Sequence, residues 1–242
     1  MTSQLYFEGP WSILSTVCIG NVLIGFVVCG ITCFNALGAV PIVSSVGGAI
    51  ANGVCYYVYY GSTSPFQSAV ASVFGNLFWL VQEASLLFYS YIILSSVLQD
   101  FRRRIFIFLF WVVMLAIILT RIPIAVFEIR PLLQSEVPLP IITNYLHIGH
   151  YSLIALLECI SAYFMIDLFV SAKKTSLEAA LRVGLFRYLV RSTEIRVAIL
   201  AVLGITRTFT HAFRTPGPKL SNIASQLDLF IYTLTCLFPV VL

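Results

Sequence analysis

Residues 105–120 read IFIFLFWVVMLAIILT and carry no charge. A helix needs about 20 apolar residues to cross the hydrocarbon core of a bilayer, and this stretch is most of one crossing. The rest of the chain continues the pattern, because 60% of its 242 residues are hydrophobic and only 10% are charged, with a mean hydropathy of +0.97. A soluble domain carries about 25% charged residues. The sequence therefore predicts an integral membrane protein.

Composition excludes two other classes of protein. The net charge is +4, but the basic residues are too few and too scattered to follow a nucleic-acid backbone. The 6 cysteines all lie in apolar runs, where a free thiol behaves as a small hydrophobic group and not as part of a disulfide framework. No metal-ligand spacing, glycine-rich phosphate loop or nucleophile elbow is present in the sequence, so we expect no metal and no cofactor.

Seven apolar spans are expected, in an all-α transmembrane bundle that forms a single domain over residues 1–242. Turn residues or charges separate the spans, which cover residues 11–34, 39–61, 70–98, 105–129, 149–172, 196–213 and 222–242. The break between the first two spans rests only on Asn35, Gly38 and Pro41. A six-span bundle with one long broken helix therefore remains as an alternative.

Basic residues in the loops predict the orientation. Nine of the 14 Lys and Arg residues lie in the third and fifth loops and three in the even-numbered loops. Because Lys and Arg are retained on the cytoplasmic side, we expect the N-terminus outside or in a lumen and the C-terminus in the cytoplasm. Residues 1–10 lack the basic start of a signal peptide.

Two further features of the loops and the end of the chain carry expectations. The fifth loop, residues 173–196, mixes apolar and basic residues at helical spacing. It is expected to form a helix on the inner leaflet or to extend the sixth span. The chain is still apolar at Leu242, and we expect it to continue.

Ionisable residues inside the spans are the functional candidates. A charge at membrane depth costs about 2.5–3.5 kcal/mol on insertion scales, so it is retained for a reason. In the orientation above, six such groups from five spans fall in one layer, at mid-depth or in the outer half of the bundle. They are Glu83, Arg121, Glu158, Arg207, His211 and Asp228. Asp167 lies nearer the cytoplasmic end and is expected to reach the headgroups.

Two interpretations of this layer are compatible with each other. In the structural one, the carboxylates are counter-ions to the two arginines and fix the bundle, since buried charges are usually paired. In the functional one, they line a polar pocket. Trp79 and Glu83 are four residues apart and share a helix face, as do Asp228 and Tyr232. The run of tyrosines at 56–60 is interpreted as part of an aromatic belt at the membrane interface.

The whole chain resembles the small seven-span integral membrane proteins of filamentous fungi, some of which are membrane-bound terpene cyclases of meroterpenoid biosynthesis. The resemblance lies in size, short loops, topology and intramembrane carboxylates. That cyclase family has a Trp-Glu pair in an early span and an acidic residue in a late one. Here the nearest equivalents are Trp79 with Glu83, four residues apart and not adjacent, and Asp228.

The resemblance implies an isomerase- or lyase-type enzyme of secondary metabolism in the endoplasmic reticulum or another endomembrane. Such an enzyme protonates a prenylated epoxide or alkene with a buried carboxyl group, because an apolar site favours the protonated form. Glu83 is the expected acid, followed by Asp228 and Glu158. The expected substrate-binding residues are Trp79, Arg121, Arg207, His211 and Tyr232. The partners implied are a lipophilic small molecule and membrane lipids.

Two alternative functions remain open from the sequence. A heptahelical receptor would bind a polar ligand in the charged layer and a cytosolic partner on its basic loops. However, the last span has no lysine for a retinal Schiff base, and residues 99–102 read QDFR instead of an Asp-Arg-Tyr signature. A proton-coupled transporter would use the same carboxylates as a relay.

Overall fold

The structure is a computed structural model that describes residues 5–32, 34–60, 64–134, 140–176, 198–210 and 223–241. The described part of the chain is built of helices, which confirms the all-α prediction there. They are α1 (Leu5–Thr32), α2 (Ala36–Tyr60), α3 (Pro65–Val97), α4 (Asp100–Gln134), α5 (Pro140–Ser176), a helix over Ala198–Thr210 named here the short helix, and α7 (Ile223–Val241).

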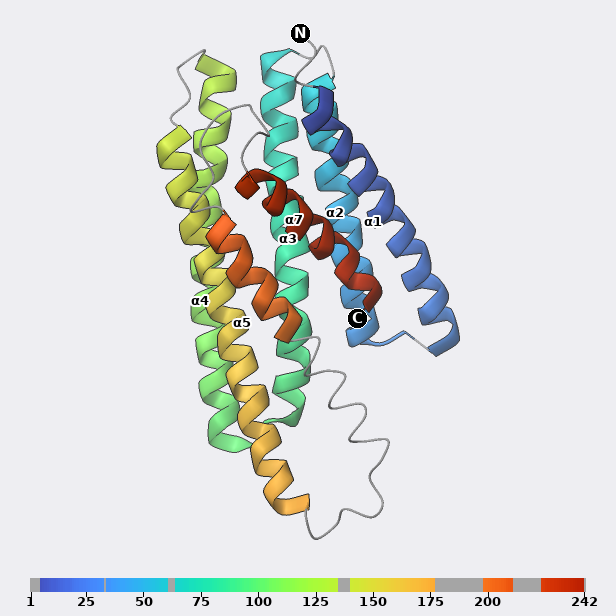
Figure 1. The fold of residues 1–242 in the computed structure, drawn as a ribbon, viewed down its shortest axis with the longest axis vertical. Coiled ribbons are helices and arrows are strands. Elements are labelled where there is room, and N and C mark those ends of the chain that lie inside the picture. The colour runs from blue at the N-terminus through green and yellow to red at the C-terminus, as the bar shows by residue number, and fades with distance from the viewer. Residues whose placement is uncertain are drawn as a thin grey trace.

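The break between the first two helices lies where the sequence predicts it. α1 ends at Thr32 and α2 begins at Ala36. The side-chain oxygen of Asn35 accepts a hydrogen bond of 2.6 Å from the backbone N–H of Gly38, which satisfies a free donor in the first turn of α2. α1 then packs along α2 (Figure 1), so the alternative of one long broken helix is wrong.

α3 is the central helix of the bundle. It packs against α2 on one side and against α4 and α5 on the other. Figure 1 shows α7 crossing obliquely, and α7 packs against α1 and α2. The short helix packs on α5, where a side chain at Gly204 would begin 3.3 Å from the Cα of Ala155. The short helix and α7 thereby cover the part of α3 that carries Glu83.

Five helices are long and apolar enough to cross a membrane: α1 from Trp11, α2, α3, α4 and α5 from Ile141. Their outward faces carry large apolar side chains, and on α1 Leu23, Phe26 and Val27 are 63%, 58% and 63% exposed. Faces of this kind require a lipid environment. The structure therefore agrees with an integral membrane protein.

The expected sixth and seventh spans are helical but are not among these five. The described short helix covers about 20 Å at 1.5 Å per residue, against about 30 Å of hydrocarbon. α7 has 19 residues, and its first turns contain Gln226 and Asp228. Within the described residues, five of the seven predicted spans are therefore confirmed as helices long and apolar enough to cross a membrane, and the other two stay a prediction. Most of the fifth loop, where an interfacial helix was expected, lies outside the described residues.

The interior divides along the bundle axis into an apolar and a polar half. α3, α4 and α5 lie side by side in Figure 1, and Leu94, Phe106, Phe110 and Leu157 form a buried cluster between them. The ring centroids of Tyr91 and Phe110 lie 4.5 Å apart there. On α3 the buried polar side chains Asn76, Gln82 and Glu83 precede Leu94 of this cluster, and Ser85 and Ser90 lie between them. Two adjacent glycines of α2, Gly47 and Gly48, allow α3 to approach closely at Gln82.

Candidate functional site

Glu83 on α3 lies at the centre of the polar half. Its side chain is 7% exposed, and each carboxylate oxygen has a basic partner. His150 Nε2 on α5 lies 2.9 Å from Oε2, and Arg207 Nη1 on the short helix lies 3.4 Å from Oε1. One carboxylate therefore joins three helices that are distant in sequence. The structural interpretation, in which a carboxylate is the counter-ion of an arginine, therefore holds for Glu83 and Arg207.

The guanidinium group of Arg207 is enclosed by two phenol rings. Its Nη2 donates a hydrogen bond of 2.8 Å to the hydroxyl of Tyr151. Its Cζ lies 4.2 Å from the ring centroid of Tyr151 and 5.0 Å from that of Tyr232. Aromatic faces stabilise a cation by their quadrupole, so this arginine has charge, hydrogen-bond and ring partners inside the bundle.

His150 is fully buried and uses both ring nitrogens. Nε2 faces Glu83, and Nδ1 lies 3.1 Å from the hydroxyl oxygen of Thr120 on α4. That hydroxyl also lies 2.9 Å from the backbone oxygen of Ile117. When Thr120 donates to Ile117 it can only accept from His150, and when it donates to Nδ1 the imidazole is neutral. The pair can thus hold either protonation state of His150.

A second set of polar side chains surrounds the hydroxyl of Tyr232 on α7. It accepts a hydrogen bond of 2.8 Å from Trp79 Nε1. It can donate to Asn52 Oδ1 at 3.2 Å or to Gln82 Oε1 at 3.4 Å. Because Trp79 and Glu83 share a face of α3, this set lies directly beside the Glu83 cluster and ties α2, α3 and α7 together.

Arg121 on α4 is buried, with 5% of its surface exposed. Its guanidinium carbon lies 5.6 Å from the ring centroid of Trp79. Its charge attracts the carboxylates of Glu83 and Glu128, but its Nε and Nη1 have no hydrogen-bond partner. The expectation that Arg121 belongs to the layer agrees with this placement, although it forms no direct salt bridge in the described residues.

Glu158 on α5 stands apart from the arginines. It is 3% exposed, and its Oε2 has no hydrogen-bond partner among the residues that the structure describes. It lines a cavity of about 40 Å³ together with Glu83 and Arg207. The rest of the lining is largely apolar: Leu86, Leu87, Ile154, Leu200, Leu203 and Gly204, with Tyr151 and Thr235. Within the described part of the chain, the cavity therefore has one carboxyl group with charged partners, Glu83, and one without, Glu158.

Three other predicted residues lie outside this centre. Asp228 on α7 is half-buried, and Thr210 Oγ1 lies 3.3 Å from its Oδ1. Asp167 forms a salt bridge with Arg102 at the opposite end of the bundle. His211 lies outside the described residues.

A larger hollow exists on the outer surface between α2 and α3. Its volume is about 470 Å³, and its lining is mainly apolar, from Gly53 and Tyr57 on α2 to Phe66 and Phe74 on α3. None of the buried charged residues lines it. It is an open groove, and the residues that line it carry no carboxyl, imidazole or guanidinium group.

Sequence reasoning missed four residues of the polar half: Glu128, His147, His150 and Tyr151. Each lies near the end of an expected span, and span ends are where polar residues are usually interfacial. Helical spacing could have identified some of them, because His147 and Tyr151 fall on the same face of α5 as the predicted residue Glu158. Arg121 and Glu128 likewise share a face of α4, seven residues apart.

Comparison with known proteins adds no relative. No protein-family model, no curated protein and no solved structure matches this chain.

Proposed function

We propose that this chain is a membrane-embedded enzyme of the terpene-cyclase type, which transfers a proton from a buried carboxyl group to a lipophilic alkene or epoxide. The observation that carries the proposal is the contrast between two carboxyl groups on one cavity. Glu83 has His150 and Arg207 as partners, while Glu158 has an unpartnered oxygen in a largely apolar wall. Pairs of titratable groups in unlike environments are typical of acid and base assignments.

The roles follow from these environments. Glu158 is the proposed proton donor, because an apolar wall favours the neutral, protonated form of a carboxyl group. Glu83 and His150 form the proposed acceptor, because the arginine holds the carboxylate as an anion beside the imidazole. This assignment exchanges the acid expected from sequence, Glu83, for Glu158. Trp79, Tyr151 and Tyr232 supply aromatic faces near the cationic layer.

The size of the cavity sets a condition on this function. Ligand pockets for molecules of drug size occupy about 300–1,000 Å³, whereas the cavity measures about 40 Å³. Substrate binding therefore requires the short helix to separate from α5, where Gly204 and Ala155 now lie in contact. A prenylated molecule would enter this gap sideways from the lipid.

Proton-coupled transport is the second candidate, and the same cavity favours it. About 40 Å³ accommodates water better than a terpenoid. The chain Thr120–His150–Glu83–Arg207–Tyr151 is continuous through hydrogen bonds and salt bridges. Chains of carboxylate and imidazole groups inside membrane proteins serve as proton relays.

We also propose that the short helix and α7 lie inside the membrane and complete seven spans, in an endomembrane. The basic third and fifth loops support a non-cytoplasmic N-terminus. A glycosylation site placed before Trp11 should then be modified in microsomes. Protection from glycosylation, with cytoplasmic labelling at the same position, contradicts this orientation.

Activity is tested in microsomes that contain the full chain and receive prenylated alkenes and epoxides. Glu158→Gln should lower product formation at least about 100-fold, the low end of what a positioned general acid contributes. Asp167→Asn is the matched control, because it changes a carboxyl group to an amide at the opposite end of the bundle, and it should keep full activity. Equal activity of Glu158→Gln and wild type contradicts the proposed donor.

A further inference from the structure

A second carboxylate–imidazole pair lies above the first. Glu128 Oε1 on α4 lies 3.3 Å from His147 Nε2 on α5, and Glu128 Oε2 accepts a hydrogen bond of 2.7 Å from the side-chain amide of Asn76 on α3. This repeats the chemistry of Glu83 and His150. Along α5 the two histidines are three residues apart, about 4.5 Å of helix rise.

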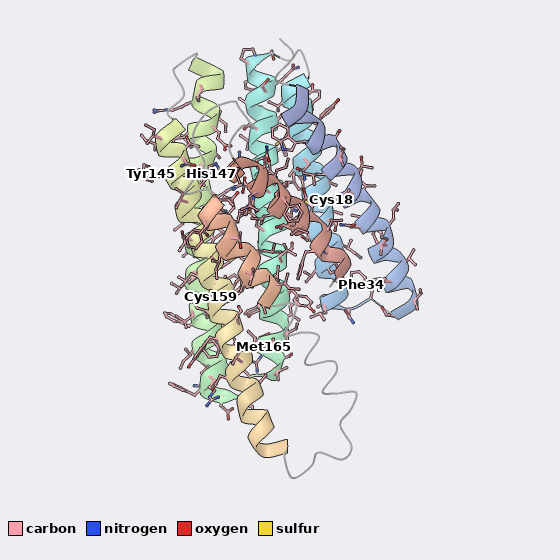
Figure 2. The ribbon with its side chains drawn as sticks, viewed as in Figure 1. Cys18, Phe34, Tyr145, His147, Cys159 and Met165 are labelled. Carbon is pink, nitrogen blue, oxygen red and sulfur yellow. The ribbon has the colours of Figure 1, made fainter. Side chains whose placement is uncertain are left out.

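The two pairs differ in their access to the surroundings. The side chains of Glu128 and His147 are 28% and 18% exposed, while those of Glu83 and His150 are 7% and 0% exposed. Figure 2 shows His147 in the upper part of α5, with Cys159, the neighbour of Glu158, lower on the same helix. Exposure therefore falls from the upper pair to the central pair, and Glu158 is buried as well, at 3% exposure.

Arg121 connects the two pairs. It follows Thr120, which contacts His150, and lies two helical turns from Glu128, about 10.5 Å along α4. In the described ranges, the buried Nε and Nη1 of Arg121 and the Oδ1 of Asn76 have no hydrogen-bond partner. Buried polar atoms without a protein partner are typical binding sites for ordered water. Water beside two carboxylates and two imidazoles can carry a proton between them.

We propose that Glu128 and His147 form the entrance of a proton-transfer path that leads past Arg121 to Glu83 and His150 and ends at Glu158. A proton taken from bulk water binds the upper pair, moves to the Glu83–His150 pair through water held by Arg121, and then crosses the cavity. Each transfer moves one proton and returns its donor to the earlier protonation state. The path deepens the proposed function and rests on it. In each reaction Glu158 gives one proton to the substrate and the substrate cation releases one to the Glu83–His150 pair, so the path returns that proton to Glu158 or exchanges it with bulk water, without net uptake.

Charged groups from four helices surround the path. They are Glu83 on α3, Arg121 on α4, Arg207 on the short helix and Asp228 on α7. Glu128 and His147 are positioning residues in this scheme, because they act on the substrate only through the central pair. Their test therefore needs a readout that structural damage alone does not produce.

The test is hydrogen–deuterium exchange of the buried carboxyl group, without substrate. The full chain in lipid nanodiscs is moved into deuterated buffer, and the carboxyl C=O stretch is followed by time-resolved infrared spectroscopy. Loss of the band in Glu158→Gln assigns it. Glu128→Gln and His147→Gln should slow the exchange about 100-fold, the low end for loss of a positioned proton-transfer group. Glu128→Asp should restore it, and Asp167→Asn should exchange as wild type.

The outcomes separate this path from the proposed function. Wild-type exchange rates in both Glu128→Gln and His147→Gln, or a wild-type band that never exchanges, overturn the path. Slowing by Asp167→Asn as well would show a general structural effect and also overturns it. Slowed exchange in a protein that converts no prenylated substrate keeps the path and rejects the enzyme.

Discussion

Replacing Glu83 by Gln tests whether one carboxylate holds three helices together. The carboxylate oxygens of Glu83 lie 2.9 Å from His150 Nε2 and 3.4 Å from Arg207 Nη1. Only 7% of the Glu83 side chain is exposed. Removing one partner of a buried ion pair costs about 3–5 kcal/mol, because the other charge stays buried without compensation. Arg207 retains its bond to Tyr151 and two ring contacts. We therefore expect the lower end of that range, about 3 kcal/mol.

Glu158→Gln is the matched comparison. It makes the same chemical change at the same cavity, but no hydrogen bond to Oε2 is lost. Its expected effect on the free energy of unfolding is below about 1 kcal/mol. The assay is unfolding of the purified protein in mixed micelles by increasing SDS, followed by helical circular dichroism. Equal destabilisation by the two variants would refute the assigned pairing.

A double-mutant cycle adds an internal control. If Glu83 and Arg207 interact directly, the double variant Glu83→Gln/Arg207→Gln should lose less free energy of unfolding than the two single variants lose together. Additive losses would mean that the 3.4 Å contact contributes nothing to stability.

Two further substitutions test the packing around this centre. Tyr232→Phe removes the hydroxyl that accepts from Trp79 and should destabilise the fold by about 1–3 kcal/mol, because buried polar groups lose their partner; a neutral effect in the SDS titration would contradict that role. Gly47→Val places a Cβ 3.0 Å from backbone atoms of Phe78 and Gln82 and should cost about 1–3 kcal/mol by overpacking α2 against α3, whereas Gly30→Val, at a site with nothing within 4 Å, should have little effect in the same titration.

The sequence predicted the positions of the helices well because apolar length and turn residues determine them. Asn35 illustrates this: its side chain caps α2 at the break that the turn pattern indicates. For the last two helices the same pattern stays a prediction, because within the described residues neither the short helix nor α7 is among the helices long and apolar enough to cross a membrane.

The sequence predicted which residues lie together in the site better than it predicted the contacts between them. Glu83, Arg207, Trp79 and Tyr232 do lie together, because charges inside a bilayer must face the interior. Which charge meets which depends on the rotation and depth of each helix, and these are set by close contacts such as that at Gly204. For this reason the partner of Glu83 on α5, His150, could not be read from spacing.

The central claim is that a buried carboxyl group donates a proton to a lipophilic substrate. Its most direct test is turnover of a prenylated alkene by wild-type microsomes in deuterated buffer, followed by mass spectrometry of the product. The account predicts a cyclised product with one deuterium bound to carbon at the protonated end of the alkene, and at least about 100-fold less of it from Glu158→Gln. No cyclised product from any prenylated alkene, or a product without deuterium on carbon, would contradict it.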